Sequence, residues 1–303
     1  MENYNGLESI LSNEKIRYDE PMCKHTTMRV GGKCDCMVLP TTIEEIKNII
    51  EYIKKENIKY YIIGNGSNLL VKDEGVHRLI IKIAGMFNEA ILDGEYLTVF
   101  SGCTMPKAAL IARRNNLTGF EFACGIPGTV GGGVRMNAGA YDGELSNIVD
   151  EVTYLDSNSN ICTIKNKDMK FSYRYSIFTE NTDWIILKIK FKLKHGIEEE
   201  IVAKMEKNKK SRIEKQPLEY PSAGSVFTRP KGYFVGKLVQ DSGLRGVSIG
   251  GAQVSEKHTG FIVNKGNATC ADVLELIKLV QRRVNEKFGV LLKTEVIVIG
   301  GEE

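Results

Sequence analysis

The sequence predicts an α+β protein built from two domains, and three features of the chain lead to this prediction. With 303 residues, the chain is long for a single domain. Segments rich in alternating β-branched residues are interspersed with segments whose apolar residues recur at helical spacing. A highly charged helical segment at 198–214, followed closely by prolines, indicates the start of a separate C-terminal part. We therefore expect a larger region over residues 1–200 and a smaller domain over 201–303.

The beginning of the chain is expected to form a β-α-β unit with further strands. Thr42 and Glu45 have the spacing of a capping box, and isoleucines then recur at helical spacing to about Glu56. Residues 1–20 are expected to form a short amphipathic helix and a turn. The predicted strands cover residues 28–40, 59–63 and 79–83.

A second unit of the same kind follows. A strand over 96–101 precedes a helix over 106–116 that begins with a proline, a residue tolerated in a first helical turn. In a later strand, lysines alternate with apolar residues, as expected for a sheet with one solvent-exposed face. The two units give expected subdomains of about 1–85 and 86–200. The remaining predicted strands of this unit cover 148–155, 161–164 and 184–193.

The C-terminal part is expected to contain helices and short strands. Residues 269–288 form a strongly amphipathic segment, and Gly289 follows it in the position where glycine commonly ends a helix. This segment is the clearest helix prediction in the chain. The other expected elements are a short helix over 233–240 and strands over 260–263 and 291–299.

Composition and charge disfavour several classes of function. The net charge of +3 is close to neutral for this length, whereas nucleic-acid binding needs a concentrated basic face. The 7 cysteines are scattered and the 4 histidines stand apart, so neither a structural metal site nor a disulfide framework is expected. The sequence has no signal-peptide pattern and no apolar run of roughly 20 residues. We expect a cytoplasmic monomer that binds no metal, membrane or nucleic acid.

Two glycine-rich stretches are the strongest candidates for a ligand site. Residues 125–141 read Gly-Ile-Pro-Gly-Thr-Val-Gly-Gly-Gly-Val-Arg-Met-Asn-Ala-Gly-Ala-Tyr, and residues 64–68 read Gly-Asn-Gly-Ser-Asn after an apolar strand. Such backbones can present exposed N–H groups to an anion such as a diphosphate, and a long structural loop is the alternative. Neither stretch completes Gly-x-Gly-x-x-Gly, and no Walker loop occurs, so a Rossmann domain is disfavoured.

Three further residues are candidates for chemistry, each with a structural alternative. Glu295 lies in an apolar run, where a buried carboxylate needs either a salt bridge or a role in sharing a proton. Arg174 lies among tyrosines, where it could clamp a carboxylate or remain solvated. Ser225 has no nucleophile elbow around it, so the sequence alone favours a structural role.

These residues lie in stretches that resemble the UDP-N-acetylenolpyruvoylglucosamine reductase family, FAD enzymes that complete UDP-N-acetylmuramate in peptidoglycan synthesis. The resemblance covers nearly the whole chain. It implies an FAD-binding region of two α+β subdomains, of the PCMH/VAO type, followed by a substrate-binding domain. The matching stretches are 27–32, 64–70, 125–141, 172–178, 215–227, 260–264 and 293–296.

The resemblance also implies a reaction and its residues. NADPH reduces non-covalently bound FAD, which passes hydride to C3 of the enolpyruvyl group of UDP-N-acetylglucosamine enolpyruvate. Arg174 and Glu295 would stabilise the developing negative charge, and Ser225 would protonate C2. Lys215 matches a substrate-binding lysine. Tyr173, Arg229 and Lys237 are further substrate-binding candidates, although the sequence alone favours solvated side chains for the two cations among them. The implied FAD-binding residues are Gly64, Asn65, Gly66, Ser67, Asn68, Leu69, Gly125, Ile126, Pro127, Gly128, Thr129, Gly131, Gly132, Asn137, Ala138 and Gly139.

The chain departs from the family pattern in a few places. Cys124, Gly133 and Arg135 stand where the family more often has small, alanine and aromatic residues. Arg135 could place a positive charge near flavin or phosphate, or point to solvent, and Cys124 raises the possibility of a covalent flavin link that the family does not use. The segment after Phe178 is short, as in the second, shorter type of the family. Two alternatives stay open: another FAD oxidoreductase on this scaffold, or a non-catalytic nucleotide-sugar binding protein.

Overall fold

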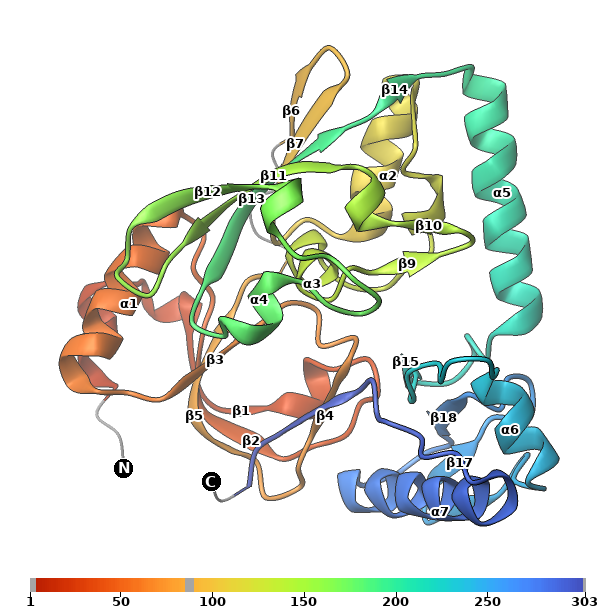
Figure 1. The fold of residues 1–303 in the computed structure, drawn as a ribbon. Helices are drawn as coiled ribbons and strands as arrows, with labels where there is room; N and C mark the ends of the chain where they lie inside the picture. Colours follow the sequence, from red (N-terminus) through yellow and green to blue (C-terminus); the bar gives the residue numbers. More distant parts are fainter. Residues whose placement is uncertain (1–3, 85–89, 302–303) are drawn as a thin grey trace. The chain divides into compact units, whose positions relative to one another are not determined.

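The computed structural model describes residues 4–84 and 90–301, and Figure 1 shows their helices and strands. The expected subdomain boundary near residue 85 therefore lies outside the described residues. The first helix, α1 (Ile43–Glu56), confirms its prediction: Thr42 Oγ1 accepts the Glu45 N–H, and the Glu45 carboxylate accepts the Thr42 N–H. Its buried residues are the isoleucines at helical spacing, Ile46, Ile49, Ile50 and Ile53.

The helix expected over residues 1–20 is wrong for the described part. Two 3₁₀-helices, Asn5–Ser9 and Asn13–Lys15, lead directly into strand β1. Asparagine, serine and glycine favour turns over helices, and they interrupt this segment too often for a continuous helix. β1 belongs to a four-stranded sheet of order β1-β2-β5-β3. Its strands are β1 (Ile16–Pro21), β2 (Lys33–Val38), β5 (Val76–Lys82) and β3 (Tyr60–Ile63).

The chain divides into two compact units, each with its own hydrophobic core. The predicted division at residue 200 concerns the functional domains, and it stays a prediction. Unit 1 comprises Met1–Arg17, Met37–Asn65 and Ile80–Arg212, and unit 2 comprises Tyr18–Cys36, Gly66–Leu79 and Ile213–Glu303.

Unit 1 contains a five-stranded antiparallel sheet of order β12-β11-β13-β7-β6. On β13, apolar residues are buried and lysines face outward, where Lys188 and Lys190 lie over the rings of Phe100 and Tyr96. The predicted solvent-exposed face is confirmed. The strands are β12 (Ile161–Lys165), β11 (Val149–Leu155), β13 (Ile185–Lys192), β7 (Tyr96–Phe100) and β6 (Ala90–Asp93).

Several helices precede, separate or follow the strands of this sheet along the chain. The short helix α3 contacts β7 and β13 (Figure 1), and the glycine stretch that forms it was not predicted to be helical. On the long helix α5, Lys204 Nζ lies 3.3 Å from the carboxylate of Glu121, a side chain that is only 2% exposed. The helices are α2 (Met105–Arg114), α3 (Val130–Arg135), α4 (Ile177–Glu180) and α5 (Glu198–Lys215). Short strand pairs complete the unit: β8 (Leu117–Thr118) with β14 (Lys194–His195), and β9 (Gly139–Ala140) with β10 (Gly143–Glu144).

Unit 2 is organised around helix α7 (Cys270–Phe288), which confirms the strongest helix prediction. Thr269 and Asp272 form a capping box, and Gly289 ends the helix in the left-handed region at φ 67°. The carboxylate of Asp73 accepts two further N–H groups of the first turn, each at 2.8 Å. The helix packs against α6 (Val235–Asp241) and a four-stranded sheet of order β15-β18-β17-β16. These strands are β15 (Ser222–Ser225), β18 (Phe261–Asn264), β17 (Ala252–Val254) and β16 (Ser248–Ile249).

The terminal strand is shorter than predicted. Only β19 (Ile297–Ile299) pairs continuously, in parallel with β4 (Leu69–Val71). Before it, Thr294 makes a single bridge to Phe227. The apolar run over 291–299 is therefore divided between two partners, which its sequence pattern does not reveal.

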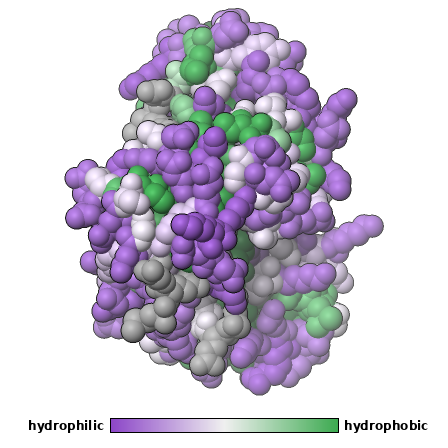
Figure 2. Space-filling view, turned by 90° about the vertical axis from the view of Figure 1, so that its left-hand side faces the viewer, coloured by the Kyte–Doolittle hydropathy of each residue, from purple (hydrophilic) through white to green (hydrophobic). Residues whose placement is uncertain are grey.

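The face drawn in Figure 2 is mostly hydrophilic, with small separate hydrophobic patches. Within the described ranges, no helix combines the length and the apolar character needed to cross a bilayer. Their two longest helices, α5 and α7, carry charged residues along their length.

Candidate active site

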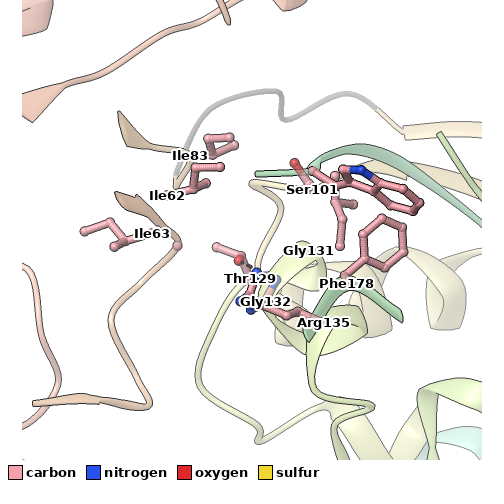
Figure 3. Close-up of a pocket in the computed structure, with 12 residues that line it drawn as sticks. Ile62, Ile63, Ile83, Ser101, Thr129, Gly131, Gly132, Arg135 and Phe178 are labelled. Carbon is pink, nitrogen blue, oxygen red and sulfur yellow. Dashed lines mark hydrogen bonds between the residues drawn. The ribbon is translucent and has the colours of Figure 1, made fainter. Parts of the chain in front are cut away.

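A pocket in unit 1 brings the two glycine stretches together (Figure 3). About 470 Å³ of space lies within it, open solvent included. Aromatic and branched apolar side chains form much of its wall. The lining residues are Ile62, Ile63, Gly64, Ile83, Ser101, Thr129, Gly131, Gly132, Arg135, Phe178, Trp184 and Ile186.

Two glycines in this pocket are required by close approach of the backbone. A Cβ on Gly64 would lie 2.4 Å from Thr129 Oγ1, and one on Gly131 would lie 2.7 Å from Ser101 Cβ. Both distances are shorter than real Cβ contacts, so a larger residue would push these segments apart. Glycine at these positions lets the loop after β3 and the residues before α2 lie directly against α3.

The backbone N–H groups at the start of α3 already have partners. Those of residues 130–133 are accepted by the carbonyls of Cys103 and Ser101 and by Oγ1 and the carbonyl of Thr129, at 2.7 to 3.2 Å. The expectation of exposed N–H groups is therefore wrong for these residues. The reason is that this part of the glycine stretch forms a helical turn whose N–H groups bind residues 101–103. A prediction of an open loop does not include these contacts.

Arg135 is the only charged residue among the described residues that line the pocket. Burial lowers the pKa of its guanidinium, because a charged group loses favourable hydration when it leaves water. The interpretation that Arg135 points to solvent does not describe this side chain. The charge that this residue brings to the pocket wall is positive.

Four of the implied FAD-binding residues line the pocket: Gly64, Thr129, Gly131 and Gly132. Others hold the backbone. The buried Asn137 amide donates to the Ser172 carbonyl at 3.1 Å and accepts the Ser146 N–H at 2.9 Å. In unit 2, the Asn68 amide donates to the Glu295 carbonyl at 3.0 Å. FAD binding by the remaining residues of that set stays a prediction.

Arg174 lies at the tip of a tight turn in unit 1. Ser172 and Tyr175 exchange both backbone hydrogen bonds at 3.1 Å, and Arg174 has φ 57°. A positive φ is uncommon for a residue with a side chain, and such residues often occur at functional sites. The guanidinium lies 5.0 Å from the ring centroid of the exposed Tyr173. Tyr173 and Arg174 are thus the two residues at the tip of one turn.

Ser225 and Glu295 are brought together in unit 2, although 70 residues of sequence separate them. The Glu295 N–H donates to the Val226 carbonyl at 2.8 Å, and the Thr228 N–H donates to the Lys293 carbonyl at 2.9 Å. The Ser225 hydroxyl donates to the Phe227 carbonyl at 3.3 Å. The catalytic roles of Ser225, Glu295 and Arg174 stay predictions.

The basic residues that the resemblance implies for substrate binding differ in their surroundings. Lys237 forms an exposed salt bridge of 2.7 Å with Asp241, one turn along α6. Arg229 donates to the Tyr233 carbonyl and lies 3.9 Å from the ring centroid of Phe234. Lys215 ends α5 as an exposed side chain. The salt bridge of Lys237 fits the structural alternative better than substrate binding.

His258 is a neighbour of Ser225 that sequence reasoning did not single out. Its Nδ1 accepts the Gly260 N–H at 3.2 Å, and a Cβ on Gly260 would lie 3.2 Å from this Nδ1 and 3.6 Å from Ser225 Oγ. Burial lowers the pKa of the imidazole. Because His258 stands alone in the sequence, only the tertiary structure reveals this position.

Comparison with known proteins identifies both halves of the chain. Residues 34–165 match the family model of the FAD binding domain, and residues 216–299 match that of the UDP-N-acetylenolpyruvoylglucosamine reductase C-terminal domain. Reductases of this name from Caldanaerobacter subterraneus subsp. tengcongensis and Clostridioides difficile are 48% and 46% identical. These matches cover 97% and 98% of this chain and 97% of each relative.

Solved structures agree. The UDP-N-acetylenolpyruvylglucosamine reductase of Thermus caldophilus is 35% identical, with a TM-score of 0.81 over 94% of this chain and 98% of that one. A glucose dehydrogenase, Phl p 4.0202, shares the fold alone: it is 13% identical, with a TM-score of 0.50 over 64% of this chain and 44% of its own. The predicted fold class is confirmed, an FAD-binding region of the PCMH/VAO type followed by a smaller α+β domain.

Proposed function

Because the chain belongs to the UDP-N-acetylenolpyruvoylglucosamine reductase family, we propose that it uses NADPH to reduce the enolpyruvyl group of UDP-N-acetylglucosamine enolpyruvate to UDP-N-acetylmuramate. Membership makes the chain an oxidoreductase with an FAD-binding domain. The single observation that carries the proposal is the 48% identity to such a reductase over 97% of both chains. Action in peptidoglycan synthesis, in the cytoplasm and as a monomer, belongs to the same proposal.

The pocket of unit 1 fits part of an FAD molecule. Its apolar wall, with Phe178 and Trp184, suits an aromatic ring, and Arg135 suits a phosphate group. Cys124 does not favour a covalent link, because burial raises the pKa of its thiol and the neutral thiol is a poor nucleophile. Gly64, Thr129, Gly131, Gly132 and Arg135 are the residues that would hold the cofactor here.

The proposed chemistry needs few protein groups. When bound, the flavin supplies hydride to C3 of the enolpyruvyl double bond. Addition at C3 leaves negative charge at C2 and on the adjacent carboxylate, which the guanidinium of Arg174 would stabilise. Glu295, in its protonated form, would share a proton with this developing enolate. The hydroxyl of Ser225 would donate the proton that C2 receives, which completes the saturated lactyl ether.

The functional division of the chain follows from these roles. The proposed substrate-binding domain covers residues 201–303 and contains Ser225 and Glu295, whereas the proposed FAD-binding region covers 1–200 and contains Arg174. Binding of the nucleotide by Lys215, with Tyr173 and Arg229, is part of the proposal, and Lys237 is its weakest member because it pairs with Asp241.

An anaerobic absorption experiment tests the function. The purified protein should show a flavin spectrum that bleaches with NADPH and returns when the enolpyruvyl nucleotide sugar is added. A flavin that bleaches without being reoxidised by the sugar would move the substrate to another oxidoreductase reaction. A protein that takes up no flavin, even with added FAD, would support nucleotide-sugar binding without catalysis.

A further inference from the structure

We propose that Arg135 is a cofactor-binding residue whose guanidinium pairs with the diphosphate of FAD, and that it supplies the positive charge that the backbone of the glycine stretch does not provide. This inference rests on FAD as the cofactor and not on the identity of the reduced substrate. Four observations in unit 1 carry it.

The first observation is that the backbone of Arg135 is fixed. The hydroxyls of Ser176 and Thr179 both donate to the Arg135 carbonyl, each at 2.8 Å. A cation at the end of a helix often interacts with the last carbonyl groups. Here two hydroxyls already bind the carbonyl of the last residue of α3, so the side chain leaves from a fixed position.

The second observation is the direction of the side chain. Figure 3 shows Arg135 running back along α3 toward Thr129 and Gly132, on the wall of the pocket. Phe178 and the apolar residues around it lie in another part of the same pocket. The pocket therefore has an apolar part and a cationic part. A ligand with an aromatic ring and an attached phosphate group matches this division.

The third observation is the missing counter-charge. None of the described lining residues is acidic, and within residues 4–84 and 90–301 the guanidinium has no hydrogen-bond or ion-pair partner. Partial burial of a cation without a partner is unfavourable, and burial lowers the pKa of the half-buried Arg135 accordingly. A bound anion would restore the lost interaction.

The fourth observation is that the backbone donors of α3 are occupied. The N–H groups of residues 130–133 all bind protein oxygens, so they do not serve an anion without breaking these bonds. A guanidinium has five N–H donors in a planar fork, which matches the oxygens of a phosphate. Arg135 is thus the cationic donor that this wall of the pocket offers to the diphosphate.

The test compares FAD with riboflavin, which has the same ring system and no phosphate. Apoprotein is prepared for the parent chain and for Arg135→Met, Arg135→Lys and the control Arg114→Met, an exposed arginine on α2. Binding is followed by quenching of flavin fluorescence at several salt concentrations. We expect Arg135→Met to weaken FAD binding roughly 10- to 100-fold. Riboflavin binding should stay unchanged, and the salt dependence of FAD binding should become weaker.

The other variants sharpen the test. Arg135→Lys should keep part of the affinity for FAD, because it retains a charge but loses the fork, and Arg114→Met should behave as the parent chain. Circular dichroism tests whether each variant is folded. If Arg135→Met does not fold, the ratio of FAD affinity to riboflavin affinity is compared between Arg135→Lys and the parent chain instead.

Three results would overturn the inference. Unchanged FAD binding in both Arg135 variants would show that the guanidinium does not pair with the diphosphate. Equal losses for FAD and riboflavin would show a role in shaping the pocket. A shifted flavin reduction potential with unchanged affinity would place the charge beside the ring instead. FAD affinity, riboflavin affinity and the flavin reduction potential can all be measured even if the protein does not reduce the enolpyruvyl sugar. Failure of the proposed function is therefore distinguishable from failure of this inference.

Discussion

The candidate residues of the two units are held in different ways. In unit 1, the pocket is formed by glycines in close backbone contact, with one cation that emerges from a fixed helix end. In unit 2, Ser225 and Glu295 lie on neighbouring extended segments whose main chains are joined by hydrogen bonds. Substitutions in the unit 1 pocket should therefore change cofactor binding and stability. Side-chain substitutions in unit 2 should change turnover and leave the cofactor in place.

The largest expected effect is that of Ser225→Ala. Without its proton donor, substrate-driven reoxidation of the reduced flavin should slow about 100- to 10,000-fold, while the flavin content stays that of the parent chain. Rapid-mixing absorbance measurements under anaerobic conditions give the rate. Ser222→Ala, on the same strand, is the control and should reoxidise normally. A normal rate in Ser225→Ala would remove the proton-donor role.

Glu295→Gln should produce the next largest effect. The main-chain bond between Glu295 and Val226 does not depend on the carboxyl group, so the fold and the flavin should persist. Reoxidation by the sugar should slow about 100- to 1,000-fold, as for the loss of one donor to a developing anion. Glu286→Gln changes an exposed glutamate on α7 and is the matched control. Loss of flavin in Glu295→Gln would contradict the division between the units.

Gly64→Ala tests the unit 1 side of the comparison. The added methyl would lie 2.4 Å from Thr129 Oγ1, and such overpacking costs about 1–3 kcal/mol. We expect a lower free energy of unfolding and weaker FAD retention. Gly236→Ala on α6 in unit 2 is the control, because its nearest contact would be 3.5 Å away and alanine favours helix. Equal stability of the two variants would show that the close contact at Gly64 relaxes freely.

The smallest effects should come from pH, and they should separate the units. In unit 1, burial raises the pKa of Glu121, but hydrogen bonds from Thr118 and Gly119 and the charge of Lys204 outweigh this and hold it below its usual value of 4.5. The unfolded chain then binds the proton first. This contribution to stability is present above pH 4.5 and is lost as the pH falls through the folded pKa.

In unit 2, burial holds the pKa of His258 below its usual value of 6.5. Protonation at Nδ1 would also break its bond to the Gly260 N–H. The unfolded chain again binds the proton first, so stability should begin to fall as the pH drops below 6.5. Denaturant titrations between pH 2 and 8 measure the stability losses of both units. His258→Gln should remove the loss that begins near 6.5, and Glu121→Gln should remove only the loss below 4.5. If stability were lost over one pH range that neither substitution changes, neither His258 nor Glu121 would control the pH dependence.

The two helices α7 and α3 show how much of the fold could be predicted. Both begin at a threonine whose side chain accepts an N–H of the first turn. In α7, the apolar stripe and Gly289 are local signals, and they predicted the helix correctly. In α3, three consecutive glycines oppose a helix, and the turn exists because its N–H groups reach residues 101–103. Only long-range hydrogen bonds decide such a case.

The candidate site shows the same division. The sequence, through its glycine stretches and family resemblance, determined the class of cofactor, the fold class and the residues to examine. The tertiary structure decided that Ser225 and Glu295 lie on joined segments and that the N–H groups of residues 130–133 are occupied. It also decided that Arg135 turns into a pocket instead of toward solvent. Local signals act over three or four residues, and these three features depend on hydrogen bonds and burial between residues far apart in the chain.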